Sequence, residues 1–118
     1  MNTVDNNSAD YKSKHEFSNP FYVIVHARDA EKDRVLRRKG SCRRVLEQIE
    51  EIRRTNPKNH VELGNISPET ILPEIPSDRP ILVCGFFRDI CVKQQMQALR
   101  RNGYNNSYIY IEGTYSLN

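Results

Sequence analysis

Four short, nearly continuous apolar runs divide the chain, and helix-like polar segments separate most of them. The runs occupy residues 21–27 (FYVIVHA), 60–63 (HVEL), 81–84 (ILVC) and 107–111 (SYIYI), and each begins directly after Pro or Asn. Such runs are typical of parallel strands that are covered on both faces. Strands that alternate with helices predict right-handed crossovers. The pattern therefore predicts a small α/β fold: a three-layer, doubly wound, mainly parallel sheet with strand order of about 2-1-3-4.

The segments between the runs carry signals for the ends of helices. Asp29 is suited to cap a short helix that runs through Arg38 and ends at Gly40, and Ser41 is suited to cap the next helix, which extends to about Thr55. Apolar residues recur at helical spacing along this longer helix. Two helices are therefore expected between the first and second strands.

Two further helical features are expected in the second half of the chain. A helix from about Asp89 to Asn102 has Gly103 in position for a left-handed C-terminal cap. Ser67-Pro68-Glu69 is suited to start one helical turn, which Pro73 would end. The connection between the second and third strands is otherwise expected to be irregular.

Length and composition indicate one domain with an N-terminal extension. The 118 residues allow one core of useful size. Residues 1–19 are dominated by Asn, Ser, Asp and Lys, so we expect a flexible arm there and a single α/β domain over residues 20–118. The polar start lacks the apolar core of a signal peptide, and no apolar stretch approaches the ~18 residues of a membrane span. We expect a cytoplasmic protein, acting in a host cytosol if it is a secreted effector, without a membrane partner.

Cysteine usage and net charge limit the kinds of site and partner that the sequence predicts. Three cysteines, with no CxxC pair and no zinc-site spacing, favour reduced thiols and give no reason to expect a metal or cofactor. The net charge of +3 is too small to indicate a nucleic-acid binder. A nucleic-acid partner is therefore not expected.

The segment after the third run carries the most specific motif in the chain. The motif consists of seven residues with a defined spacing over some twenty positions: Gly85, Asp89, Cys91, Val92, Ala98, Gly103 and Tyr104. In these residues the chain resembles the isochorismatase-like cysteine hydrolases, over about a third of its length. The resemblance implies a Rossmann-like sheet and an Asp-Lys-Cys triad that attacks amide-type substrates, with Cys91 at the nucleophile position.

Other positions depart from that family's pattern. Where the family has its catalytic Asp, this chain reads His26-Ala27-Arg28, and residues 64–80, where its Lys would lie, contain no lysine. Arg88 replaces the Thr of the family's Thr-Asp pair. The resemblance therefore implies a degenerate scaffold, a pseudoenzyme, because a fold can persist after its site is lost.

Cys91, His26 and Asp29 form the alternative, catalytic interpretation. A thiol in the first turn of a helix feels the positive end of the dipole, and His26 and Asp29 are suited to act as its base and as the group that orients that base. The competing interpretation is that Cys91 is a small buried residue and His26 a hydrogen-bonded residue at a strand end.

Two surface features favour binding of a partner. Six basic side chains crowd into eleven residues: Arg34, Arg37, Arg38, Lys39, Arg43 and Arg44. They are suited to an acidic protein surface or to phosphates, although solvated helices are often equally charged. Of the adjacent Phe86 and Phe87, one is expected to face the core and the other a dimer or partner contact.

These features lead to two hypotheses of function. The first is a non-catalytic binding or inhibitory module that recognises a protein with an acidic surface and forms a homodimer. In length, texture and basic segment the chain also resembles small bacterial effectors that inhibit ubiquitin deamidase and transglutaminase effectors, although no motif carries this second resemblance. The alternative is a minimal cysteine hydrolase that uses Cys91 and His26 on an amide-type small molecule. The identity of the partner or substrate is not readable from the sequence.

Overall fold

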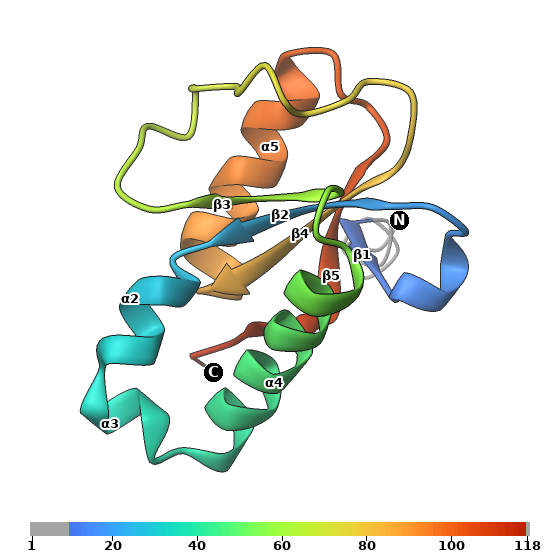
Figure 1. The fold of residues 1–118 in the computed structure, drawn as a ribbon. Helices are drawn as coiled ribbons and strands as arrows, with labels where there is room; N and C mark the ends of the chain where they lie inside the picture. The colour runs from blue at the N-terminus through green and yellow to red at the C-terminus, as the bar shows by residue number, and fades with distance from the viewer. Residues whose placement is uncertain (1–9, 118) are drawn as a thin grey trace, which may run out of the picture.

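The computed structural model describes residues 10–117, which form a five-stranded sheet with helices on both faces (Figure 1). The strands are β1 (Tyr11–Lys12), β2 (Phe21–Val25), β3 (His60–Leu63), β4 (Ile81–Phe86) and β5 (Ser107–Tyr115). They lie in the order β1-β5-β4-β2-β3, and every pair is parallel. The predicted small, parallel α/β fold is therefore confirmed, and the predicted order 2-1-3-4 is that of β3-β2-β4-β5.

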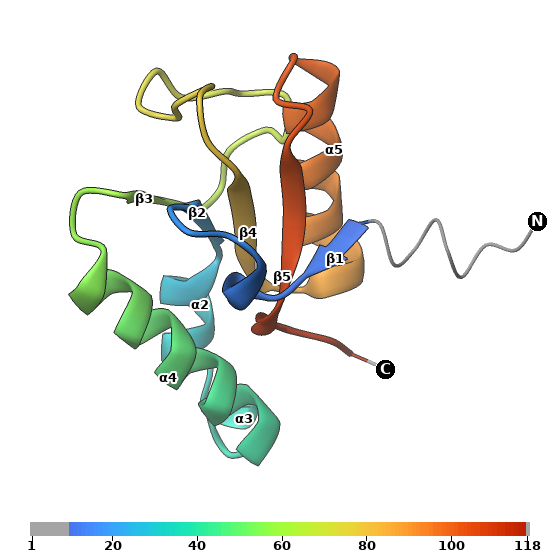
Figure 2. The ribbon, with the colours of Figure 1, turned by 90° about the vertical axis from the view of Figure 1, so that its right-hand side faces the viewer.

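The helices make the outer two layers. After β2 come α2 (Ala27–Lys32), α3 (Arg34–Arg37) and α4 (Gly40–Thr55), and after β4 a π-helical turn (Arg88–Val92) leads into α5 (Lys93–Arg101). Figure 2 shows α4 and α5 on opposite sides of β4 and β5. The crossovers therefore run to opposite sides, and the sheet changes winding direction between β2 and β4.

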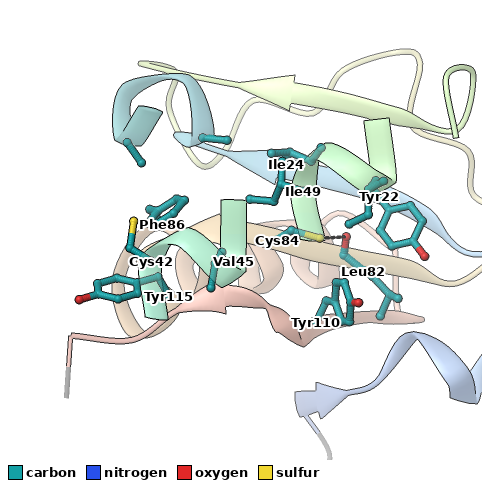
Figure 3. Close-up of a cluster of buried hydrophobic side chains, with 13 residues drawn as sticks. Tyr22, Ile24, Cys42, Val45, Ile49, Leu82, Cys84, Phe86, Tyr110 and Tyr115 are labelled. Carbon is teal, nitrogen blue, oxygen red and sulfur yellow. Dashed lines mark hydrogen bonds between the residues drawn. The ribbon is translucent and has the colours of Figure 1, made fainter. Parts of the chain in front are cut away.

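Alternation along the central strands divides the core into two parts. Tyr22 and Ile24 of β2 pack under α4, whereas Val23 and Val25 pack under α5. Figure 3 shows the part under α4, where Cys84 lies among large side chains from β2, β4, β5 and α4. Because both faces of β2 and β4 are buried, their sequences are apolar throughout.

Gly85 lies inside β4, beyond the end of the apolar run 81–84 that predicted this strand. The strand continues to Phe86, and its pairing with β5 shifts register between Val83 and Gly85. At Gly85, φ is 112°, and a Cβ built there would lie 2.0 Å from the carbonyl oxygen of Val25. Only glycine fits this close approach of two backbones.

The helical region after β2 differs from the expected capping pattern. Asp29 lies inside α2, and Asp33 instead caps α3 by accepting hydrogen bonds from the backbone N–H groups of Val35 (2.9 Å) and Leu36 (3.0 Å). Gly40 begins α4 rather than ending the preceding helix. Two short helices therefore replace the single helix that was expected, because Asp33, four residues after Asp29, caps a new helix.

The crossover between β3 and β4 holds no helix in the structure. The segment that begins at Ser67 forms only a turn, in which the N–H of Thr70 donates to the carbonyl of Ser67 at 2.9 Å. Within residues 10–117, no helix combines the length and apolar character needed to cross a membrane.

Part of the expected N-terminal arm belongs to the sheet. β1 pairs with β5, and Asp10 forms an ion pair with Arg100 at 2.7 Å. The ring of Phe17 stacks on Tyr108 with 5.4 Å between centroids. Part of the segment that the sequence assigned to the arm, between residues 10 and 17, therefore packs on the sheet. Residues 1–9 lie outside the described part of the chain.

Candidate functional site

The candidate site lies where the winding direction of the sheet changes. His26 follows β2 directly, and Phe87 follows β4, so the segments that leave these neighbouring parallel strands meet at one edge. In doubly wound sheets this edge is the usual place for a ligand.

A cavity of about 290 Å³ opens at this edge, and we call it the edge cavity. Five of its lining residues were predicted from the sequence: His26, Asp29, Phe86, Phe87 and Cys91. The others are Ala30, Asp33 and Leu36. The fold thus brings Cys91 to the same cavity as His26 and Asp29, from which it is far away in the sequence.

His26 occupies an unusual backbone position. Its φ is 57°, its backbone N–H donates to the carbonyl of Leu63 at 2.8 Å, and its Nδ1 lies 2.9 Å from a carboxylate oxygen of Asp29. Because an ionised carboxylate only accepts hydrogen bonds, Nδ1 carries the proton of this contact. Nε2 is therefore the nitrogen left for any other contact.

Cys91 lies partly exposed in the π-helical turn. The backbone N–H groups of Ile90 and Val92 both donate to the carbonyl of Phe87 at 3.1 Å, which fixes the turn. No hydrogen bond joins the thiol to His26 among the described residues. The pair therefore shares a cavity without forming a preassembled nucleophile and base.

The other two thiols are buried core groups. Burial raises the pKa of Cys42 and raises that of Cys84 far above its ordinary value. Cys84 donates weakly to the carbonyl of Leu82 at 3.8 Å (Figure 3). Both are therefore packing residues, and Cys91 is the thiol that a small molecule can reach.

Arg88 does not point its charge at Cys91. Its guanidinium donates to the hydroxyl of Thr114 at 2.8 Å and to the carbonyls of Ile111 and Thr114. These bonds tie the π-helical turn to the end of β5. The guanidinium of Arg88 is therefore engaged by β5 and is not placed to hold a thiolate at Cys91.

The two adjacent phenylalanines have different surroundings. Phe86 is 2 % exposed and packs against Tyr115 under α4 (Figure 3), so it is a core residue and not a partner contact. Phe87 is half-buried and forms one wall of a shallow groove with Ile90 and Leu117, both of which are exposed. Of the pair, only Phe87 can contact a partner.

The six predicted basic residues are all exposed, but they do not form one surface. Arg44 lines a separate groove beside the end of β5, and Lys39 immediately precedes α4. The others line a groove of about 510 Å³ between α3 and α4, which we call the arginine groove: Arg34, Arg37, Arg38 and Arg43, with Leu46 and Glu47.

Arg53, at the other end of α4, has the opposite surroundings. It is 10 % exposed and forms a bidentate contact with Glu62 (2.7 and 2.9 Å) and further bonds to Glu31 (2.8 Å) and Glu50 (3.0 Å). We call these four residues the Arg53 cluster. The hydrogen bond to Glu62 raises the pKa of Arg53, and burial opposes that rise. Burial would raise the pKa of Glu62, but the hydrogen bond and charge of Arg53 lower it below 4.5.

Sequence reasoning did not single out two polar residues of this region. Asp33 was not recognised as the cap that shapes both the edge cavity and α3. Gln95 lies on the apolar face of α5 beside Met96 and Leu99. A polar residue on such a face was the signal that could have drawn attention to it.

No group of His, Cys, Asp and Glu side chains within residues 10–117 is arranged to hold a metal ion. Compared with protein-family models, curated proteins and solved structures, the chain matches none of them.

Proposed function

We propose that the protein is a non-catalytic binding module that docks an acidic protein surface at the arginine groove. In this proposal its scaffold is a degenerate isochorismatase-like domain, used to recognise or inhibit another protein in the cytosol, of a host cell if it is a secreted effector. A bacterial effector that deamidates or transglutaminates ubiquitin is one class of target that the proposal includes.

One observation carries the proposal. In the described chain, every arginine outside the basic segment has a partner: Arg28, Arg53, Arg54, Arg79, Arg100 and Arg101 pair with carboxylates, and Arg88 binds β5. The side chains of Arg34, Arg37, Arg38, Arg43 and Arg44 form no ion pair or hydrogen bond with described residues. The fold thus gives its other arginines partners of their own, whereas these five, four of which line the arginine groove, have none among the described residues, which supports docking of an acidic outside partner.

Phe87 supplies an apolar contact of the kind that anchors interfaces. It lines the shallow groove with Ile90 and Leu117, and Val35, on α3, is 67 % exposed. Exposed apolar groups near a charged surface favour an interface in which charge guides encounter and apolar anchors slow release. We include a homodimer through Phe87 in the proposal, and light scattering at tens of micromolar tests it.

The test uses a partner captured by affinity purification and identified by mass spectrometry. The double variant Arg37→Glu/Arg38→Glu should lower the association rate at least tenfold and reduce its dependence on salt. Phe87→Ala should leave the association rate near that of the wild type and speed dissociation.

A matched variant controls for overall charge. Arg54→Glu/Lys58→Glu makes the same change in net charge at exposed positions outside the groove, and it should bind nearly as the wild type does. Equal losses in both double variants would refute a specific groove, because net charge alone would then explain the effect.

A second candidate function, a minimal cysteine hydrolase, is favoured by the gathering of Cys91, His26 and Asp29 around the edge cavity. In it, the Cys91 sulfur attacks an amide or ester carbonyl carbon while Nε2 of His26 takes the thiol proton. That proton passes to the leaving group as its bond to the carbonyl breaks, and water then hydrolyses the thioester.

Hydrolysis of p-nitrophenyl acetate tests this candidate. Activity above the solvent rate that survives in Cys42→Ser but disappears in both Cys91→Ser and His26→Gln would support it. If Cys91→Ser keeps the wild-type rate, the candidate is wrong. Under the binding function, Cys91→Ser should leave binding of the captured partner largely intact.

A further inference from the structure

The edge cavity combines an apolar inner wall with an acidic rim. Its apolar lining residues are buried or half-buried: Ala30, Leu36, Phe86 and Phe87. Asp29 and Asp33 line the same cavity, and both residues are exposed. The apolar groups therefore form the inner wall, and the two carboxylates lie at the rim, where solvent and a ligand can reach them.

Each rim carboxylate keeps one oxygen without a partner. The Oδ2 atom of Asp29 accepts from His26, and the Oδ1 atom of Asp33 accepts both hydrogen bonds that cap α3. The other oxygen of each side chain accepts no hydrogen bond from the described residues. Neither carboxylate forms an ion pair with a Lys or Arg of the described chain. The rim therefore holds negative charge that this part of the protein does not neutralise.

The two arginines that directly neighbour these aspartates in the sequence have their charge elsewhere. Arg28 pairs with Glu31 and Glu62 at 3.7 and 3.4 Å, and Arg34 lines the arginine groove. No Lys or Arg is among the described residues that line the edge cavity. The cavity is therefore acidic, although the whole chain carries a net charge of +3.

The size and walls of the edge cavity limit what this charge can attract. An engineered cavity of about 150 Å³ binds benzene, so the edge cavity, at about 290 Å³, has room for one ring and a short chain. A metal ion does not suit this lining, because the apolar side chains supply no ligand atoms and no group of side chains within residues 10–117 is arranged to hold one. An anion would meet uncompensated carboxylates. An organic cation matches both the apolar wall and the acidic rim.

We infer that the edge cavity binds a small organic ammonium compound whose apolar body is a single ring. The ring packs against Leu36 and Phe87, and the ammonium group lies at the rim, where Asp29 and Asp33 attract it. An ammonium group keeps its charge at neutral pH and carries three donors. No residue of the arginine groove lines this cavity, and binding needs no reaction at Cys91, so the inference rests on neither of the two proposed functions.

The test compares three probes of similar shape on the full chain. Phenethylamine carries the ammonium group, 2-phenylethanol replaces it with a neutral hydroxyl, and phenylacetate replaces it with a carboxylate. NMR titrations at neutral pH and low salt should give saturable binding that is about tenfold tighter for the amine than for the alcohol, with phenylacetate the weakest. Nuclear Overhauser effects from the ring of the amine should reach Leu36 and Phe87. Equal affinities of amine and alcohol, tighter binding of phenylacetate, or ring contacts only with residues outside the cavity would each overturn the inference.

A double variant of the rim tests the role of its charge. Asp29→Asn/Asp33→Asn removes both charges and keeps the acceptor oxygens, because asparagine caps helices as well as aspartate does. The advantage of the amine over the alcohol should vanish in this variant. In Glu74→Gln/Asp78→Asn, which makes the same change in net charge at exposed positions outside the cavity, the advantage should persist. An undiminished advantage in the rim variant, or an equal loss in the control, would contradict the inference. If the rim variant does not fold, the probe comparison and the ring contacts in the wild type decide the question.

Discussion

The two ends of α4 carry arginines in opposite circumstances. Near its C-terminus, Arg53 is almost enclosed and bonded to Glu31, Glu50 and Glu62, which come from α2, α4 itself and β3. Near its N-terminus, Arg43 lies in the arginine groove, exposed and without a carboxylate partner in the described chain. One helix therefore holds one positive charge that the fold uses and others that the fold leaves available.

This contrast indicates where a charge matters. A buried, multiply bonded ion such as Arg53 is costly to disturb because its removal leaves carboxylates uncompensated. An exposed, unpaired arginine contributes little to folding but creates a field that an approaching acidic surface feels. Stability and binding should therefore respond to different arginines of the same helix.

The largest effect on stability is expected from Arg53→Met. Three carboxylates lose their common donor, and the free energy of unfolding should fall by about 2–3 kcal/mol. Urea denaturation measures the change, with Arg54→Met on the exposed side as the control, expected within about 0.5 kcal/mol of the wild type. Equal losses in the two variants would erase the contrast between buried and exposed arginines.

Acid should weaken the Arg53 cluster in the next largest step. Because the pKa of Glu62 is below 4.5 in the folded chain, its contribution is complete above pH 4.5 and is lost as pH falls through the folded pKa. The free energy of unfolding should therefore decline with falling pH below 4.5, and Glu62→Gln should make that decline shallower. An unchanged slope in Glu62→Gln would assign the acid sensitivity to other carboxylates.

A smaller loss of stability is expected from Asp33→Ala. The cap of α3 is removed, and the free energy of unfolding should fall by about 1 kcal/mol. Because α3 carries Arg34 and Arg37, association with the captured partner should slow as well. Asp78→Ala, an exposed loop change, should alter neither quantity, and slower association in both variants would count against a role for the cap.

The smallest effect on stability is expected in the arginine groove itself. Arg37→Glu/Arg38→Glu should keep the free energy of unfolding within about 0.5 kcal/mol of the wild type, because neither guanidinium has a partner to lose. The same variant should show the largest fall in association rate. A loss of several kcal/mol in urea denaturation would show that the groove supports the fold.

Local sequence patterns were sufficient to predict most of the architecture. The runs 21–27 and 81–84 predicted central strands because both faces of a buried parallel strand are apolar, and this property is written in consecutive residues. The edge strand β1 was missed because two half-buried residues, Tyr11 and Lys12, leave no such run. Asp33 was missed as a cap because two aspartates four residues apart are equally good candidates until the path of the backbone is known.

The candidate site depended on both levels. The sequence alone determined that His26 and Cys91 lie near the ends of neighbouring strands, since the runs and their order fix which strand ends meet; the structure ends β2 at Val25, before His26. Only the tertiary structure decided that Phe86 is buried while Phe87 is not, that Gln95 faces no acceptor, and that Arg53 is paired while Arg43 is not. The physical reason is the distance along the chain over which each property is determined. Apolar periodicity is a pattern of near neighbours in the chain. Burial, ion pairing and hydrogen-bond satisfaction depend on groups such as Glu31 and Glu62, which folding brings from distant segments.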